Sequence, residues 1–329
     1  MKAIVYRNYG SPDVLKCEEI EKPTPGNDEV LIRVRAASLN PLDRHLMKGG
    51  PYIVRILLGL LGPKIKRPGR DVAGQVEAVG RNVTQFKPSD EVFGTCRGAL
   101  AEYVCTSESA VVMKPDNVTF EQAASVPVAA LTALQSLRDK GQIQRGQKVL
   151  VNGAAGGVGT FAVQIAKWFG ANVTGVCSTR NVEMVRSIGA DRVIDYTQED
   201  FTRSGQRYDL IFDLVGNHSF SACRRVLNPK GTFIAAGVLG LGGTMIALLA
   251  FSITGLVLSL FVGQRFVMSV ARLSKEDLSI MGELMATGKV TPVIDRRHRL
   301  IEVPEAIRYL EERHAQGKVV ITLESNDKT

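Results

Sequence analysis

Two rhythms of apolar and polar residues divide the chain near residue 120. Before that point, short runs alternate between apolar and polar positions, as in residues 30–36, where every second residue is apolar. A period of two is typical of a half-buried β-strand, and residues 71–80 and 100–104 show similar patterns. Because glycine and proline punctuate these runs, the pattern predicts an antiparallel, partly closed β domain.

After residue 120, short apolar strands alternate with helical segments. Residues 120–140 have a helical pattern. Beyond them we expect helices at 157–169, 181–188 and 220–227, and strands at 148–152, 173–176, 192–195, 210–213 and 232–236. This alternation is typical of βαβ units around a parallel sheet. We therefore predict an α/β domain over residues 121–289, and a β domain over residues 1–120 and 290–329 that includes a strand at 319–323.

A glycine-rich segment lies where a dinucleotide-binding turn is expected, after a strand and at the start of a helix. Gly156 lets the backbone approach a pyrophosphate, and Gly159 lets the helix pack against the strand. The helix N-terminus presents unpaired N–H groups to the phosphates. Ala154 replaces the first glycine of the G-x-G-x-x-G pattern, so a plain strand-to-helix turn is the alternative. The strands that follow favour dinucleotide binding on a doubly wound Rossmann sheet.

The end of the second predicted α/β strand indicates which dinucleotide is bound. A site for NAD places a carboxylate there to bind the ribose 2′-hydroxyl. Here Ser178 offers a hydroxyl and Arg180 a guanidinium, and no acid follows the strand. This pair suits the 2′-phosphate of NADPH; the alternative is that Arg180 is a surface residue at a helix start.

Composition and charge add little to this prediction. The 329 residues are 45% hydrophobic and 22% charged, and the five cysteines form no close pair, which predicts reduced thiols in a cytoplasmic protein. The N-terminus lacks the pattern of a signal peptide. The net charge of +8 comes from basic residues that are mostly scattered, so we expect no specific nucleic-acid partner. The basic cluster of residues 64–70 is the exception.

Two apolar runs need a separate explanation. Residues 231–264 contain no charged side chain, and residues 245–262 just reach the length of a spanning helix. Their position inside an α/β domain favours a buried strand and helix, at the interface of a homodimer. Residues 53–61 form the second run, which the basic cluster follows. Apolar residues beside basic ones also favour peripheral membrane contact through 53–61 and 245–262.

The sequence resembles the zinc-independent quinone oxidoreductases, a zeta-crystallin-like family of the medium-chain dehydrogenase/reductase superfamily. The resemblance covers nearly the whole chain. It rests on the motifs around residues 37–43, 68–74, 130–133, 146–167 and 317–320. It implies a GroES-like antiparallel β-barrel beside the Rossmann domain, and the cofactor NADPH.

The resemblance also implies site residues. The positions near the nicotinamide and the substrate, predicted to be catalytic, are Asn40, Asp43 and Tyr52. The predicted cofactor-binding positions are Thr132, Ala155, Gly156, Gly157, Val158, Gly159, Ser178, Arg180, Tyr196, Gly237, Val238 and Leu239. At His45 some relatives carry tyrosine; a histidine there could donate a proton or be structural.

We predict no metal. Zinc-using members of the superfamily carry a catalytic cysteine and a Gly-His-Glu motif. Here Asn40 stands in the place of the cysteine, and residues 69–71 read Gly-Arg-Asp. Four scattered histidines do not supply the three or four clustered ligands that zinc needs.

Without zinc, nothing strong polarises an ordinary ketone, whereas a quinone or an α,β-unsaturated carbonyl already accepts hydride at carbon. The predicted function is therefore NADPH-dependent reduction of a small lipophilic quinone or enone. The Asn40 amide and the Tyr52 hydroxyl would orient the substrate. The alternatives are an enoyl-thioester or alkenal reductase, and a non-catalytic NADPH-binding sensor or RNA-binding protein.

Overall fold

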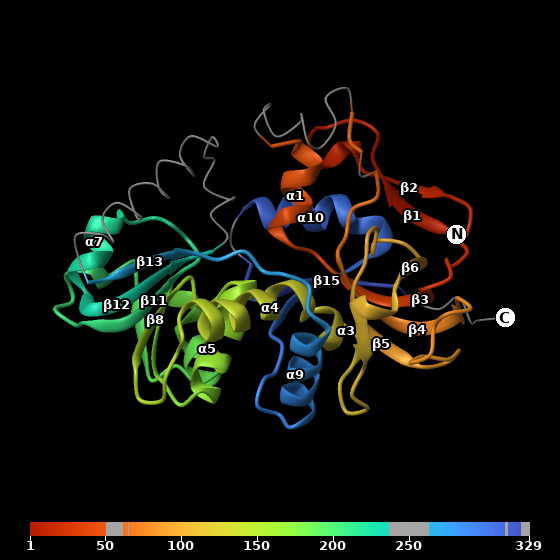
Figure 1. The fold of residues 1–329 in the computed structure, drawn as a ribbon. Coiled ribbons are helices and arrows are strands. Elements are labelled where there is room, and N and C mark those ends of the chain that lie inside the picture. The colour runs from red at the N-terminus through yellow and green to blue at the C-terminus, as the bar shows by residue number, and fades with distance from the viewer. Residues whose placement is uncertain (51–61, 65, 237–262, 313–314, 324–329) are drawn as a thin grey trace. The chain divides into compact units, whose positions relative to one another are not determined.

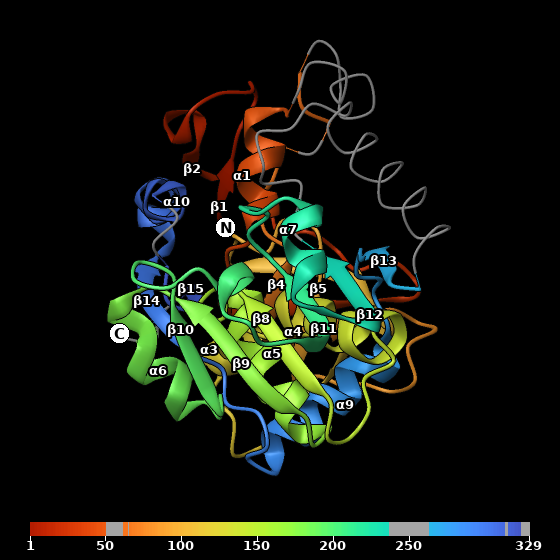
Figure 2. The ribbon, with the colours of Figure 1, turned by 90° about the vertical axis from the view of Figure 1, so that its left-hand side faces the viewer.

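The computed structural model describes residues 1–50, 62–64, 66–236, 263–312 and 315–323. The chain forms two compact units (Figures 1 and 2). Unit 1 comprises Met1–Ala129 and Leu273–Thr329, and unit 2 comprises Ala130–Arg272. The domain division predicted from the sequence, at residues 120 and 290, stays a prediction.

Unit 1 is built on a seven-stranded sheet in the order β14-β15-β3-β4-β5-β7, with β6 paired to β3. The pair β14–β15 is parallel and the other pairs are antiparallel. A separate antiparallel pair is formed by β1 (Lys2–Val5) and β2 (Lys16–Glu19). The strands of the large sheet are β3 (Glu29–Ser38), β4 (Asp71–Val79), β5 (Glu91–Thr95), β6 (Tyr103–Ser107), β7 (Val111–Met113), β14 (Ile294–Arg299) and β15 (Lys318–Thr322).

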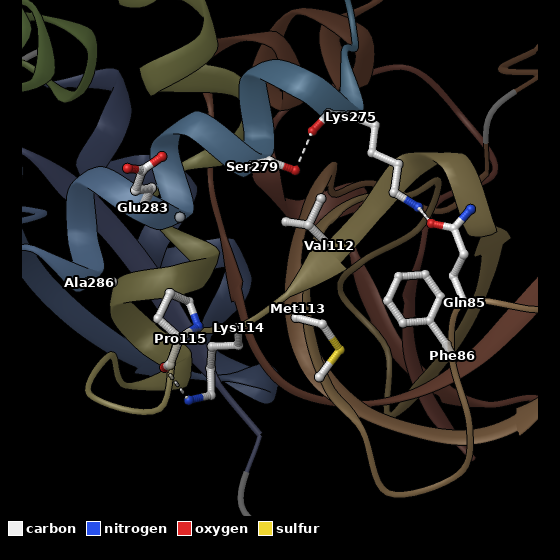
Figure 3. Close-up of a pocket in the computed structure, with 11 residues that line it drawn as sticks. Gln85, Phe86, Val112, Met113, Lys114, Pro115, Lys275, Ser279, Glu283 and Ala286 are labelled. Carbon is white, nitrogen blue, oxygen red and sulfur yellow. Dashed lines mark hydrogen bonds between the residues drawn. The ribbon is translucent and has the colours of Figure 1, made fainter.

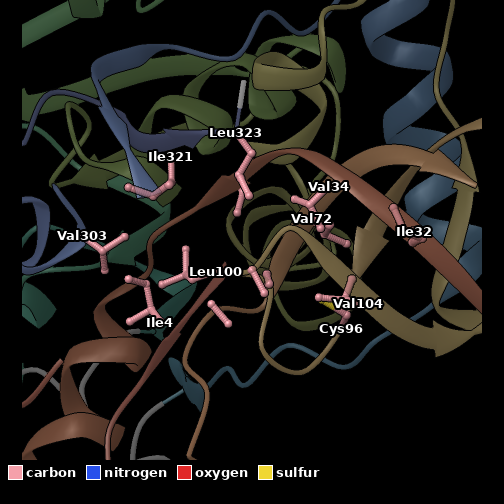
Figure 4. Packing of buried hydrophobic residues seen from close by; sticks show 14 of the residues in the cluster. Ile4, Ile32, Val34, Val72, Cys96, Leu100, Val104, Val303, Ile321 and Leu323 are labelled. Atoms are coloured by element: carbon pink, nitrogen blue, oxygen red, sulfur yellow. The ribbon is translucent and has the colours of Figure 1, made fainter. Parts of the chain in front are cut away.

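The core of unit 1 explains why these segments are strands. Side chains from β1, β3, β4, β6 and β15 meet in one apolar cluster, which Figure 4 shows. On β3, Ile32 and Val34 are buried while Arg33 and Arg35 are half-buried, so the predicted period of two is confirmed over these positions, whereas Leu31 on the opposite face is buried as well.

Helices complete unit 1. Helix α9 packs against β7, α3 packs on β3 and β4, and α10 packs beside α1. Their bounds are α1 (Pro41–Lys48), α3 (Phe120–Ala124), α9 (Lys275–Ala286) and α10 (Val303–Glu311). Short 3₁₀ turns occupy Pro12–Val14, Glu108–Ala110 and Leu300–Glu302.

Unit 2 is a parallel six-stranded sheet in the order β10-β9-β8-β11-β12-β13, which Figure 2 shows from one side. The chain therefore runs outward through three strands, returns to the middle, and runs outward again, which is the Rossmann topology with its switch point between β8 and β11. The strands are β8 (Lys148–Asn152), β9 (Asn172–Cys177), β10 (Arg192–Asp195), β11 (Tyr208–Asp213), β12 (Leu227–Ala235) and β13 (Arg265–Met268).

Helices cover this sheet, and the predicted α/β fold class is confirmed. Helix α5 packs on β8 and β9, α6 on β9 and β10, and α7 on β12. Their bounds are α5 (Gly157–Trp168), α6 (Val182–Ser187) and α7 (Phe220–Arg225), with 3₁₀ turns at Thr179–Asn181 and Phe201–Arg203.

The predicted helix over residues 120–140 is three segments in the structure. Helix α3 ends at Ala124, α4 (Pro127–Gln135) begins two residues after its C-cap, and a π-helical turn covers Ser136–Lys140. Pro127 explains the first break, because proline disfavours helical backbone in the residue before it.

Within the described residues, no helix combines the length and the apolar character needed to cross a membrane. The two apolar runs at 53–61 and 245–262 lie outside the described residues.

Candidate active site

The junction between β3 and α1 carries the first predicted site residue. Strand β3 ends at Ser38 and α1 begins at Pro41, so Asn40 is the N-cap of α1, with the extended backbone usual at that position. Asn40 is only 3% exposed. A buried amide must have its polar atoms paired, so its partners define the site.

The sheet register supplies those partners from two neighbouring strands. Val320 of β15 and Asp71 of β4 both lie opposite Ser38 of β3, on its two sides. Lys318 begins β15 and Asp71 begins β4. The end of β3 is therefore flanked by one buried cation and one buried anion, which are 3% and 0% exposed.

These side chains form a closed hydrogen-bond network, here called the Asn40 cluster (Ser38, Asn40, Asp71 and Lys318). Lys318 Nζ donates to Asn40 Oδ1 at 2.7 Å and to Asp71 Oδ2 at 3.2 Å. Asn40 Nδ2 and Ser38 Oγ both donate to Asp71 Oδ2 at 2.9 Å. The Val128 N–H donates to Asp71 Oδ1 at 3.0 Å. Both oxygens of the Asp71 carboxylate are therefore satisfied without water.

Asp43 has a different surrounding. Its carboxylate accepts the Asn40 N–H at 2.8 Å and the Gly69 N–H at 3.0 Å, and with Asn40 it forms a capping box at the start of α1. Burial raises the pKa of Asp43 to about 6, against the opposing effect of these two hydrogen bonds. Asp43 thus fixes the backbone that carries Asn40.

Neither Lys318 nor Asp71 was predicted as a site residue from the sequence. Both lay inside motifs on which the family resemblance rested, at 317–320 and 68–74, and this was the available signal. What the motif does not give is the partner: Lys318 and Asn40 are 278 residues apart in the chain, and only the pairing of β15 with β3 brings them together.

The other predicted residues of this group are placed as follows. Tyr52 lies outside the described residues. His45 is half-buried on α1, with its Nε2 3.3 Å from Arg44 Nη2. Thr132 is half-buried on α4.

In unit 2, the glycine-rich turn joins β8 to α5 as predicted. The positive φ that makes the turn, +89°, belongs to Gly153 and not to residue 154. Ala154 is fully buried, and a Cβ built on Gly175 would meet its side chain at 3.0 Å. The alanine at the first motif position therefore packs between β8 and β9, while the preceding glycine supplies the unusual backbone conformation.

The two remaining motif glycines differ in their surroundings. A Cβ at Gly159 would lie 2.0 Å from the Gly153 carbonyl oxygen, so no side chain fits there. A Cβ at Gly156 would meet only that same oxygen, at 3.5 Å. Gly156 therefore faces open space at the start of α5, and a bound pyrophosphate could use that space.

The N-terminus of α5 is prepared for an anion. The helical ladder begins with the bond from the Thr160 N–H to the Gly156 carbonyl, at 2.9 Å. The N–H groups of Gly157, Val158 and Gly159 precede this bond and have no intrahelical acceptor. Together with the buried Ala155 backbone, they fit the phosphates of a dinucleotide.

The ends of β8 and β11 are tied together beside this turn. Asn152 Nδ2 donates to Asp213 Oδ1 at 2.9 Å and to Asn217 Oδ1 at 2.9 Å. The same Asp213 oxygen accepts the Val215 and Gly216 N–H groups at 3.0 and 2.9 Å. This tie holds the topological switch point, where ligands bind in sheets of this kind.

The end of β9 carries the predicted 2′-phosphate residues. Ser178 is half-buried and Arg180 is exposed in the 3₁₀ turn after β9. The Tyr196 N–H donates to the Cys177 carbonyl at 3.0 Å, which brings Tyr196 beside the same strand end. The Asp195 carboxylate at the end of β10 accepts the Thr197 N–H and hydroxyl at 3.0 and 2.8 Å, and it also hydrogen-bonds Thr179, which lies between Ser178 and Arg180. Gly237, Val238 and Leu239 lie outside the described residues.

A separate hollow of about 420 Å³ lies on unit 1 between β7 and α9 (Figure 3). At its rim Lys275 Nζ donates to Gln85 Oε1 at 2.6 Å and lies 5.0 Å from the centre of the Phe86 ring. None of the predicted site residues lines this hollow. Among the described residues, no three histidine, cysteine or acidic side chains gather in a way that could hold a metal ion.

Comparison with known proteins matches both units. The family described as alcohol dehydrogenase GroES-like domain matches residues 26–116, and that described as zinc-binding dehydrogenase matches residues 188–321. The chain is 37% identical to the chloroplastic NADPH-dependent alkenal/one oxidoreductase of Arabidopsis thaliana, over 98% of this chain and 79% of the relative. It is 34% identical to the chloroplast envelope quinone oxidoreductase homolog of the same plant, over 98% of both chains.

A solved structure agrees with these relatives. The quinone oxidoreductase of Coxiella burnetii superposes with a TM-score of 0.85 at 30% identity, covering 98% of this chain and 99% of that one. The fold and the sequence identity, each over nearly the whole chain, indicate the same family. The chain belongs to the zinc-independent quinone oxidoreductase family of the medium-chain dehydrogenase/reductase superfamily.

Proposed function

We propose that this protein is an NADPH-dependent oxidoreductase that transfers hydride to a quinone or an α,β-unsaturated carbonyl compound. The observation that carries the proposal is the end of β9, where Ser178 and Arg180 follow the strand and no carboxylate does. A hydroxyl and a guanidinium suit a 2′-phosphate. Relatives named as NADPH-dependent alkenal/one oxidoreductase and quinone oxidoreductase support the same reaction.

In this proposal the two units hold different partners. The backbone of Ala155, Gly156, Gly157, Val158 and Gly159 binds the pyrophosphate. Thr132 contacts the cofactor, and the segment Gly237, Val238 and Leu239 lies by the nicotinamide ribose. Ser178, Arg180 and Tyr196 bind the 2′-phosphate. NADPH, when bound, supplies the hydride.

Unit 1 holds the substrate. Asn40 and Tyr52 hydrogen-bond its carbonyl oxygen, and Asp43 positions Asn40 through the capping box. The two dipoles stabilise the negative charge that develops on this oxygen as hydride adds to the conjugated carbon. Such a substrate needs no metal, because its own conjugation delocalises the charge. The absence of a bound metal stays a prediction.

Purified protein tests this proposal with NADPH or NADH and three acceptors: 1,4-benzoquinone, 9,10-phenanthrenequinone and a 2-alkenal. We expect turnover with NADPH that EDTA leaves unchanged. A preference for the 2-alkenal would favour the alternative of an alkenal or enoyl-thioester reductase, which the first of the relatives above supports by name. Nucleotide binding without turnover of any acceptor would favour the sensor alternative.

Arg180→Ala tests the cofactor assignment. Because a hydrogen bond to a charged group contributes about 1.5–3 kcal/mol, we expect the KM for NADPH to rise about 10- to 100-fold while the KM for NADH stays the same. Arg186→Ala is the matched control, since Arg186 is exposed on α6 and pairs with Glu183. Equal effects of Arg180→Ala on both cofactors would rule out the 2′-phosphate role.

We also propose a homodimer and peripheral membrane contact. Strand β13 ends the sheet of unit 2 in the described part of the chain, and such an edge can pair with a second copy. The apolar runs at 53–61 and 245–262 and the basic residues at 64–70 support contact with anionic lipid. Analytical ultracentrifugation should give twice the chain mass of 35.7 kDa. Sedimentation with anionic liposomes should fall in the Leu57→Asp/Leu60→Asp variant, and unchanged sedimentation would exclude the membrane contact.

A further inference from the structure

The orientation of the Asn40 amide is fixed by the chemistry of its neighbours. Lysine has only donors and an ionised aspartate has only acceptors. Lys318 Nζ lies 2.7 Å from one polar atom of the Asn40 side chain, and Asp71 Oδ2 lies 2.9 Å from the other. The atom beside Lys318 must therefore be oxygen and the atom beside Asp71 must be nitrogen. In a flipped amide, the Asn40 N–H groups would face the donor Lys318, and the Asn40 oxygen would face the acceptor Asp71.

The same neighbours polarise the amide. An ammonium group on Oδ1 draws electron density toward the oxygen and leaves the two N–H groups more positive. One N–H donates to Asp71, and this is the single hydrogen bond that Asn40 Nδ2 donates within the described part of the chain, so the second N–H is available to a ligand. Because the site is buried, this polarisation is not damped by water.

We propose that Lys318 and Asp71 are positioning residues that present the second Asn40 N–H as a strengthened donor to the substrate carbonyl oxygen. This inference rests on the proposed function. As hydride adds to the conjugated carbon, the C=C and C=O electron pairs shift so that the oxygen becomes an enolate. One proton from solvent completes the reduction, and the nicotinamide leaves oxidised. The Asn40 N–H stabilises the enolate. Lys318 holds the Asn40 amide in place and polarises it without contacting the substrate.

Three variants separate this role from a purely structural one. Lys318→Met leaves the buried Asp71 carboxylate without its cation and should lower both stability and kcat. Lys318→Met/Asp71→Asn removes both charges, and stability should recover, because loss of a whole buried pair costs far less than loss of one partner. The kcat should not recover, since the Lys318 ammonium group that polarises Asn40 is still missing. Lys114→Met is the matched control: Lys114 is also buried in unit 1 and also pairs with a carboxylate, that of Glu91 at 2.9 Å, but its other acceptors are the Pro115 and Val118 carbonyls and not a predicted site residue.

We expect kcat to fall about 10- to 100-fold in both Lys318 variants, with the KM for NADPH unchanged and kcat in Lys114→Met at the wild-type value. Denaturation midpoints should fall in Lys318→Met and Lys114→Met and return in the double variant. Recovery of kcat together with stability in the double variant would overturn the inference. So would a wild-type kcat in folded Lys318→Met.

A second measurement needs neither cofactor nor substrate. In protein labelled with ¹⁵N-asparagine, the Asn40 side-chain amide is the signal lost in Asn40→Ala. We expect its protons to be shifted downfield in the wild type and to return toward the usual asparagine range in both Lys318 variants. Equal shifts in the wild type and in Lys318→Met would overturn the polarisation. If the wild type reduces no quinone or enone, the proposed function and the catalytic role of Asn40 fail together, and the amide signal still reports on the network.

Discussion

At the scale of single residues, the glycines of the α5 turn show how a sequence motif separates into different physical requirements. Spacing alone predicted Gly156 and Gly159, because the motif is local. It did not predict that Gly153 takes the positive φ and that Ala154 is core. That arrangement depends on Gly175 of the next strand, which makes room for the alanine.

Two alanine substitutions should separate folding from cofactor binding. Gly159→Ala forces a Cβ to within 2.0 Å of a backbone oxygen, and we expect a loss of about 1–3 kcal/mol in the free energy of unfolding, together with weaker NADPH binding. Gly156→Ala has room in the protein, so stability should be kept while NADPH binding weakens, because the new methyl occupies the space of the pyrophosphate. Urea denaturation and NADPH titration measure the two effects. Tight NADPH binding by Gly156→Ala would contradict a pyrophosphate site at the start of α5.

Asp43 should make stability depend on pH. Its pKa is raised to about 6 by burial, so between its unfolded value near 4 and about 6 the folded state holds a proton that the unfolded state has lost. The contribution of Asp43 to the free energy of unfolding is therefore greatest below pH 4, and it is lost as the pH rises through 6. A shift of about two pKa units corresponds to about 3 kcal/mol.

Comparison with Asp43→Asn isolates this effect from the other carboxyl groups. The difference in unfolding free energy between wild type and variant should shift against the wild type by up to about 3 kcal/mol from pH 4 to pH 7. Asp71 and Lys318, which also act on Asp43, are present in both proteins. A difference that does not change with pH would show that Asp43 keeps its ordinary pKa.

At the scale of elements, local sequence patterns determine which segments form strands and helices, whereas non-local strand pairing determines which side chains meet. Strands β8 to β12 and helices α5 to α7 of unit 2 were predictable, as was the alternation over residues 32–36 of β3, since each depends on a short stretch of residues. The Asn40 cluster was not, because it requires the register of β15 on β3 and of β3 on β4. A family motif can mark Lys318 and Asp71, but it does not state which side chain they contact.

Strand β11 offers a test of how an element supports the site, because it carries an aspartate at each end. Asp213 accepts Asn152 and the Val215 and Gly216 N–H groups at the carboxyl end. Asp209 accepts the Lys148 N–H and Asn228 Nδ2 at the amino end. Alanine at either position leaves donors unpaired and should cost about 1–3 kcal/mol of stability.

Only Asp213→Ala should weaken NADPH binding, since ligands bind at the carboxyl ends of parallel strands. We expect an increase in the NADPH Kd of about tenfold for Asp213→Ala and none for Asp209→Ala, measured by fluorescence titration at a temperature where both variants are folded. Equal Kd values in the two variants would show that the tie between β8 and β11 is not part of the cofactor site.

At the scale of the whole molecule, each unit has an apolar core of its own, one around β3 and β4 and one around β8, β11 and β12. The proposed cofactor-binding residues that the structure describes, from Thr132 to Tyr196, belong to unit 2, whereas the Asn40 cluster belongs to unit 1. Catalysis needs both, but NADPH binding should stabilise mainly the unit that carries its phosphates.

Hydrogen exchange can measure this difference. NADPH at about 100 times its Kd stabilises the state that binds it by about 2.7 kcal/mol, which slows exchange about 100-fold for amides that exchange only through unfolding of unit 2. We expect this slowing in peptides from β8 and α5 and a clearly smaller change in peptides from β3 and β4. Equal slowing in both sets would mean that the two units unfold together. In that case a substitution in the Asn40 cluster that lowers the stability of unit 1 would also weaken NADPH binding, and the KM for NADPH would no longer separate positioning from folding.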